Sequence, residues 1–148
     1  MALIVAIVGA ATGIASLGWN MIAWRRQGPA LVGEAKVVGR GDQMIITGRL
    51  RNVGRMDATV NKITLSWLSP AGSWATRPAR LRIELVDGHL KGMDIPHPLP
   101  AQAGTEFTIA DIEAIDPGLY LALHDGREAT IRFITASGAE ARAKIKYK

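Results

Sequence analysis

Few residues in this sequence have the types and spacing that metal or acid–base chemistry requires. His89, Asp94 and His97 come close together in the chain, and imidazole and carboxylate groups are common metal ligands. Their spacing fits no established zinc or calcium pattern, and a proline stands on each side of His97. We therefore interpret this segment as a polar loop, and we expect neither a metal ion nor another cofactor.

Nucleophilic catalysis is not indicated either. The sequence contains no Gly-x-Ser-x-Gly segment and no cysteine, which excludes a serine nucleophile elbow and a catalytic thiolate. Arg40-Gly41-Asp42 is known as an adhesion tripeptide, but glycine and aspartate are also what a hairpin turn requires. His124-Asp125 stands at the expected end of a helix, where an imidazole complements the helix dipole. These patterns favour turns and caps over catalytic groups.

Charge is unevenly distributed along the chain, which has a net charge of +5 and a pI of about 10.0. Eleven basic residues stand against three acidic ones from Arg25 to Arg82, and nine acidic against two basic from Glu84 to Glu128. This segregation predicts a surface with two electrostatic faces. A basic face attracts anionic lipid headgroups, but an ordinary solvated surface is the simpler interpretation.

Nucleic acid is not an expected partner in spite of the basic pI. Binding of single strands requires exposed aromatic rings among the basic residues. Trp74, near Arg77 and Arg80, is the one aromatic residue of the domain with that pairing, and most of the others fall at expected core positions.

An uncharged N-terminal segment, residues 2–24, is the strongest feature of the sequence. Twenty-three residues form a helix of about 35 Å, which is long enough to cross the hydrocarbon core of a bilayer. Trp19 and Trp24 suit the headgroup region at one end, and Arg25 and Arg26 follow directly. Gly28-Pro29 then ends the helix. The segment therefore predicts a transmembrane helix with its interface at these tryptophans and arginines.

The flanking charges predict how this helix is oriented. No basic residue precedes the apolar run, and the run is long for a cleavable signal peptide. Because the positive charge lies on the carboxyl side, the positive-inside rule predicts a single-pass membrane protein with a cytoplasmic C-terminal domain.

The same helix carries two stripes that favour self-association. A heptad-like seam is formed by Leu3, Ile7, Ala10, Ile14, Leu17, Met21 and Trp24. Beside it runs a stripe of small or polar residues that includes Gly9, Gly13 and Asn20. An apolar helix is buried either in lipid or among copies of itself, and the sequence leaves both open. The expected partners are thus membrane lipid or the helices of other copies in a homo-oligomer.

The remaining chain, residues 28–148, predicts a separate domain after the helical segment 1–27. β-Branched runs separated by glycine turns predict about seven strands, and Asp116-Pro117 predicts the start of one short helix. The strands are expected at residues 30–39, 43–51, 58–68, 81–85, 106–109, 128–136 and 139–147. The pattern favours a mainly β fold, an immunoglobulin-like β-sandwich preceded by a long hydrophobic helix. Lysines alternate along the last expected strand, which suggests an exposed edge.

The segment GRLRNVGRMDATVNKITL, residues 48–65, resembles a pattern of bacterial immunoglobulin-like accessory domains. In that pattern a strand ends in Asn-x-Gly, here Asn52 and Gly54, and the next strand opens with alternating Val60 and Ile63. The whole layout is similar to small proteins of actinobacteria and their phages, in which an apolar helix precedes such a domain. This resemblance implies an architecture and a setting, and no activity.

Two functions of different classes follow as expectations. The first is a non-enzymatic structural or interaction protein, with a β-sandwich tethered to a membrane by a helix that self-associates. The alternative is a phage virion component, a minor tail or tail-tip subunit, whose apolar helices bundle in the assembly or enter the host envelope. An enzyme built on the loop of His89, Asp94 and His97 is the third class.

Overall fold

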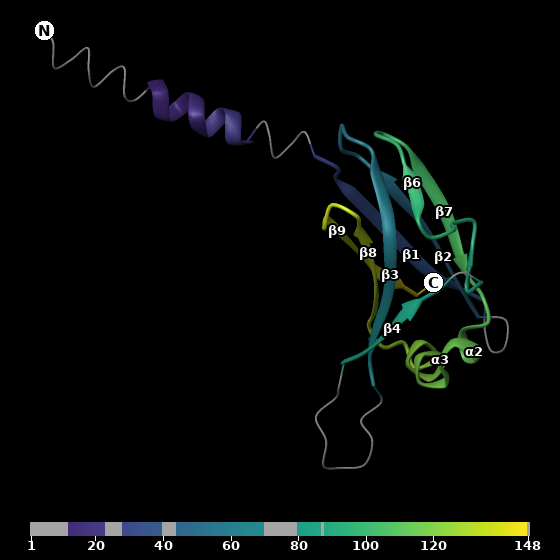
Figure 1. Cartoon of the computed structure of the whole chain (residues 1–148). Helices are drawn as coiled ribbons and strands as arrows, with labels where there is room; N and C mark the ends of the chain where they lie inside the picture. The colour runs from purple at the N-terminus through teal and green to yellow at the C-terminus, as the bar shows by residue number, and fades with distance from the viewer. Residues whose placement is uncertain (1–11, 23–27, 40–43, 70–79, 87, 148) are drawn as a thin grey trace, which may run out of the picture.

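The structure is a computed structural model, which describes residues 12–22, 28–39, 44–69, 80–86 and 88–147. Residues 12–22 are helical, and a mainly β domain follows them (Figure 1). Among the described residues no helix is both long enough and apolar enough to span a membrane. The rest of the predicted helix, residues 2–11 and 23–24, lies outside the described part of the chain.

The described part of the domain contains nine strands and two short helices. The strands are β1 Leu31–Val38, β2 Ile45–Asn52, β3 Ala58–Leu68, β4 Arg80–Leu85, β5 Leu90–Lys91, β6 His97–Leu99, β7 Gly104–Ile109, β8 Ala129–Thr135 and β9 Glu140–Lys146. The helices are α2 Ile112–Ile115 and α3 Pro117–His124.

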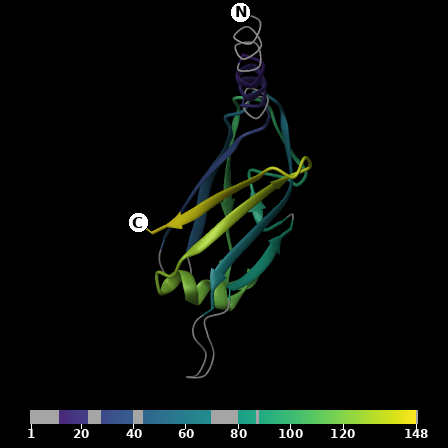
Figure 2. The same ribbon diagram turned by 90° about the vertical axis from the view of Figure 1, so that its left-hand side faces the viewer.

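The strands form one curled, mixed sheet in the order β4-β3-β8-β9-β1-β2-β7-β5, with β6 paired to β3 beside this path. Most neighbours are antiparallel, but β1 and β9 are parallel and are paired only at Ala35 with Ile145 and Lys36 with Lys146. This short parallel contact joins one half of the sheet, β1-β2-β7-β5, to the other. Figure 2 shows β8 and β9 running obliquely across the strands behind them.

Alternation of side chains along the strands builds a single core between the two halves. In β8 every second residue is buried, and β9 buries Ala141, Ala143 and Ile145. Phe107 of β7 and Phe133 of β8 meet in this core as an edge-to-face pair. The exposed residues of the same strands form the outer face of the sheet, which carries the charges.

The predicted helix is confirmed at α3, because the expected capping residues are in place. Asp116 accepts a hydrogen bond from the backbone amide of Leu119 at 3.0 Å, and Pro117 occupies the first turn. Leu119 and Leu123 are buried against the sheet. α3 therefore closes one end of the core.

Each of the seven expected strands is present, with bounds that differ by one or two residues at most ends. Two short strands and one helix were missed, namely β5, β6 and α2. β6 lies in the proline-rich loop, and its pairing with β3 at Pro98 suits a strand with one free side. The prediction that the last strand lies at an edge is wrong, because β9 pairs with both β8 and β1.

Candidate functional site

The described helix presents part of the predicted self-association stripe. Gly13, Ile14, Leu17, Asn20 and Met21 all lie within helical residues 12–22, and so does Trp19 of the predicted membrane interface. The other predicted residues lie outside the described part of the chain: Leu3, Ile7, Gly9, Ala10, Trp24, Arg25 and Arg26.

Nothing in the described part of the β domain covers this helix. Ile14, Leu17 and Met21, which follow one another at spacings of three and four, are 73%, 70% and 72% exposed. Trp19 and Ile22 are exposed as well. Large apolar side chains grouped on an exposed helix mark a surface that another molecule covers.

The chain enters the domain through a junction centred on Asn52, whose side chain is buried. Its carboxamide oxygen accepts hydrogen bonds from the backbone amides of Ala30 at 3.3 Å and Gly54 at 3.0 Å. Its amide nitrogen donates to the carbonyl oxygens of Met56 at 2.7 Å and Leu99 at 3.2 Å. One side chain therefore joins the first residues after the helical segment to the loop between β2 and β3 and to the end of β6.

Gly54 completes this Asn52 junction because its position has no room for a side chain. A Cβ atom there would lie 2.5 Å from the amide nitrogen of Ala30 and 2.9 Å from the Cα of Pro29. Val53 also donates from its amide to the carbonyl of Ala30 at 2.7 Å. The Asn-x-Gly pattern seen in the sequence thus holds the end of the domain at which the chain enters.

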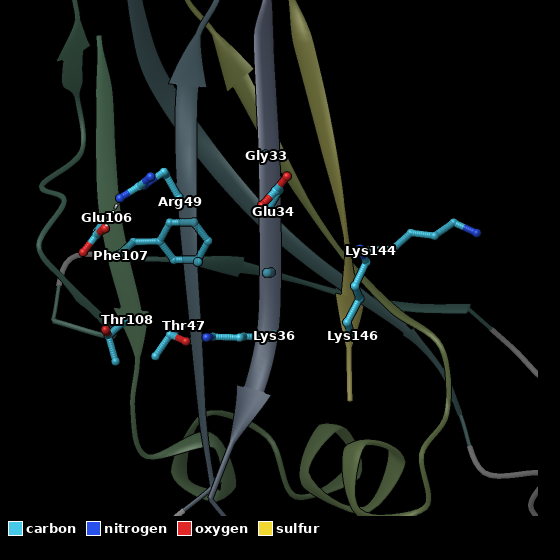
Figure 3. A pocket seen from close by; sticks show the side chains of 12 residues that line it. Gly33, Glu34, Lys36, Thr47, Arg49, Glu106, Phe107, Thr108, Lys144 and Lys146 are labelled. Carbon is cyan, nitrogen blue, oxygen red and sulfur yellow. Dashed lines mark hydrogen bonds and ion pairs between the residues drawn. The ribbon is translucent and has the colours of Figure 1, made fainter. Parts of the chain in front are cut away.

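A second feature is a hollow of about 580 Å³ on the outer face of β9, β1, β2 and β7 (Figure 3). Its charged and hydroxyl-bearing residues are Glu34, Lys36, Thr47, Arg49, Glu106, Thr108, Lys144 and Lys146. These side chains point outward because their neighbours in each strand, such as Ala35 and Phe107, point into the core. We call this feature the outer-face hollow.

Strand register arranges these side chains in two rows. One row runs Lys146–Lys36–Thr47–Thr108 across β9, β1, β2 and β7. The neighbouring row runs Glu34–Arg49–Glu106, where Arg49 Nη2 lies 2.6 Å from Glu106 Oε1. The first row therefore places two lysines and two threonines at adjacent register positions, whereas the second alternates in charge.

Several strand cations outside the first row have a carboxylate partner, although Arg51, Arg80, Arg82 and Lys91 have none among the described residues. Lys144 Nζ lies 2.9 Å from Glu128 Oε1, and Lys62 pairs with Glu84. Glu140 lies between Arg132 and Arg142, and hydrogen bonds from these two guanidinium groups lower its pKa to about 2. Lys36 and Lys146 make no ion pair with any described residue.

The structure does not gather the histidines into a metal site. Within the described part of the chain, no three His, Asp or Glu side chains are grouped closely enough to hold a metal ion. His97 instead lies in β6, opposite Val60 of β3. His124 is in the last turn of α3, as the sequence predicted. Trp74, Arg77 and residues 40–42 lie outside the described residues.

Sequence reasoning missed the outer-face hollow. Its one signal was the alternation of Arg142, Lys144 and Lys146 in the last strand, which was interpreted as protection of an edge. The position of Lys146 beside Lys36 depends on the parallel pairing of β9 with β1, and these strands are about 100 residues apart in the chain.

No protein-family model matches the sequence, and no curated protein matches it. Among solved structures, the chain is similar to the archaellum periplasmic stator protein FlaG from Sulfolobus acidocaldarius, with a TM-score of 0.49 and 10% identity over 79% of this chain and 99% of that one. It is also similar to part of a GH20 exo-β-N-acetylglucosaminidase from Vibrio harveyi, with a TM-score of 0.31 and 15% identity. That match covers 80% of this chain and 18% of the enzyme. At these TM-scores neither likeness assigns an activity or a partner to this chain.

Proposed function

We propose that this chain is a non-enzymatic structural or interaction protein, in which the N-terminal helix tethers the β domain to a membrane and the domain lies on the cytoplasmic side. The observation that carries the proposal is the exposure of Ile14, Leu17 and Met21 together on one helix. Leaving three large apolar side chains in water costs about 1.5–3 kcal/mol each relative to burial. The sequence favours lipid as the environment that buries these side chains. Residues 2–24 are uncharged, tryptophans stand near the end of this run, and Arg25 and Arg26 follow it directly.

The Asn52 junction supports a tethering role. A tether transmits force or orientation only if the chain is held where it enters the domain. The hydrogen bonds of Asn52 and the close approach of Gly54 hold Ala30 there, six residues after Trp24. For the domain we propose the immunoglobulin-like sandwich arrangement, with the half that contains Phe107 packed on the half that contains Phe133.

Membrane tethering is tested by flotation of the full-length chain with phosphatidylcholine vesicles. We expect the chain to float with the vesicles and to stay bound at high salt, because burial of apolar side chains is not screened. The variant with Ile14→Lys and Leu17→Lys should remain in the dense fraction, because two charges in the helix oppose insertion.

The matched control places the same two charges on the β domain. Val86→Lys and Leu121→Lys also replace exposed apolar residues, and this variant should float like the wild type. If wild type and both variants stay unbound, or if all three float equally, the tether is excluded.

The alternative function is a virion component whose helices bundle within an assembly. The spacing of Ile14, Leu17 and Met21 favours it, because these exposed residues form one continuous seam. The mass of the full-length chain in mild detergent, compared with a chain beginning at Gly28, separates the two functions. A defined oligomer that the shorter chain loses supports the bundle, whereas two monomers support the simple tether.

A further inference from the structure

Two lysines stand directly beside each other on the outer face, with no acid between them. Lys36 of β1 and Lys146 of β9 share one register position, on adjacent parallel strands and on the same side of the sheet. Like charges opposite one another destabilise a sheet. We propose that the outer-face hollow is a binding site for the phosphate group of a water-soluble small molecule, and that this anion neutralises the two ammonium groups.

The charged groups around the pair do not neutralise it. Glu34 is in the hollow, but it occupies the neighbouring row opposite Arg49, and Arg49 is itself paired with Glu106. Lys144 extends away from the row, where it meets Glu128 (Figure 3). Among the described residues, then, neither Lys36 nor Lys146 has a carboxylate within ion-pair distance.

The rest of the row supplies the hydroxyl groups that a tetrahedral oxyanion requires. Thr47 is opposite Lys36 in the register, and Thr108 is opposite Thr47. In Figure 3, Lys36 extends toward Thr47. Ammonium groups and hydroxyls all donate hydrogen bonds to phosphate oxygens, and donation from a charged group to an anion makes the stronger bonds.

The size and the second row of the hollow fit a ligand that is larger than phosphate itself. A volume of about 580 Å³ is within the range of small-molecule sites. The Arg49–Glu106 pair and Glu34 present both donors and acceptors next to the phosphate position. These groups suit the polar remainder of a phosphorylated metabolite, such as its hydroxyl or amino groups.

The position of the row favours a soluble ligand over a lipid headgroup. Lys36 follows Ala30 by six strand residues, which is about 20 Å along β1 from the Asn52 junction. The chain reaches the proposed membrane from that junction, so the row lies well away from the point of attachment. The phosphate site does not depend on the tether, because all of its residues belong to the β domain.

The experiment is calorimetric titration of the full-length chain in mild detergent with sodium pyrophosphate, a soluble probe with the proposed chemistry. We expect saturable binding at one site. Replacing Lys36→Gln and Lys146→Gln together should weaken it by about tenfold or more, since two charge-assisted hydrogen bonds are lost. Thr47→Val should weaken it as well, and Thr47→Ser should not.

A charge-matched variant shows whether the site or the net charge matters. Lys62→Gln and Lys91→Gln remove the same two charges from β3 and β5, and they should change the affinity by less than about twofold. Absence of saturable binding by the wild type overturns the proposal. So does an equal loss of affinity in both double variants, which would mean unspecific attraction to a basic protein.

A second comparison distinguishes the two sources of phosphate. The titration is repeated with the chain in nanodiscs of phosphatidylcholine and of phosphatidylglycerol. We expect similar pyrophosphate affinities in both. If pyrophosphate binds in the phosphatidylcholine discs but not in the phosphatidylglycerol discs, the lipid headgroups occupy the site. That result would overturn the proposal of a soluble ligand.

Discussion

Phe107 and Phe133 meet edge to face in the core, with ring centroids 5.3 Å apart and an interplanar angle of 62°. Phe107 belongs to β7 and Phe133 to β8, which are on different halves of the curled sheet. Both rings are buried, and the ring of Phe107 also lies against Gly48, where a Cβ atom would clash with it. This pair is therefore a direct contact between the two halves. Within the described part of the chain, strand pairing joins these halves only at β1 and β9.

Phe133→Ala should lower the free energy of unfolding by about 3–5 kcal/mol, because it removes a buried ring and leaves a cavity. Chemical denaturation followed by tryptophan fluorescence measures this change. Leu121→Ala on the exposed side of α3 is the control, and it should cost far less. A similar loss in both variants would contradict the importance of the contact between the halves.

Asn52→Ala should destabilise the domain by about 2–4 kcal/mol, since it leaves buried backbone groups at Gly54 and Leu99 without their partner. Asn52→Asp keeps the accepting oxygen but loses the donating amide, so it should be destabilised as well. The comparison variant is Gln102→Ala, which removes bonds to the carbonyls of Val53 and Gly54 from the exposed rim of the same region. Its denaturation midpoint should stay closer to that of the wild type.

The helix seam makes a prediction that a matched pair of variants tests. Ile14 belongs to the seam with Leu17 and Met21, whereas Ile22 is an equally apolar residue outside both predicted stripes. Ile14→Asn should reduce oligomerisation in mild detergent, and Ile22→Asn should not, because only the first residue faces a partner helix. Light scattering after size-exclusion chromatography measures the mass. Identical masses for both variants and the wild type would mean that the helix does not self-associate through this seam.

Glu140 makes the stability dependent on pH in the acid range. Its pKa is about 2 in the folded protein, against an ordinary value of 4.5, because Arg132 and Arg142 hydrogen-bond to the carboxylate. The stabilisation is therefore present above about pH 4.5 and is lost as the pH falls toward 2.

The corresponding measurement is the thermal midpoint of wild type and Glu140→Gln as a function of pH. The wild type should be the more stable protein at neutral pH, and the difference should shrink steadily between pH 4.5 and pH 2. Glu113→Gln is the control, because it removes a carboxylate that makes no ion pair with the described residues. A constant difference across this range would contradict the role given to Glu140.

Local patterns in the sequence determined most elements of the domain. Runs of β-branched residues bounded by turn signals indicated β3 and β8. β8 then buries every second residue, whereas β3 is buried on both faces from Ile63 to Trp67. Asp116-Pro117 located the start of α3, since a capping carboxylate and a proline without an amide hydrogen both suit the first turn. β5, β6 and α2 are only two to four residues long, so they carry too few residues to show a period. β5 and β6 form by pairing with β7 and β3, and α2 buries Ile112 in the core.

Only the tertiary structure decided which strands are neighbours, and therefore which charged side chains lie next to one another on the outer face of the sheet. The sequence placed Lys36 and Lys146 in expected strands, but it did not show that they share a register position. The parallel contact of β1 and β9 follows from the packing of the two halves over a common core, to which Phe107 and Phe133 contribute. The apolar N-terminal run was plain from composition alone, because apolar residues all round a helix require burial whatever the fold of the domain behind it.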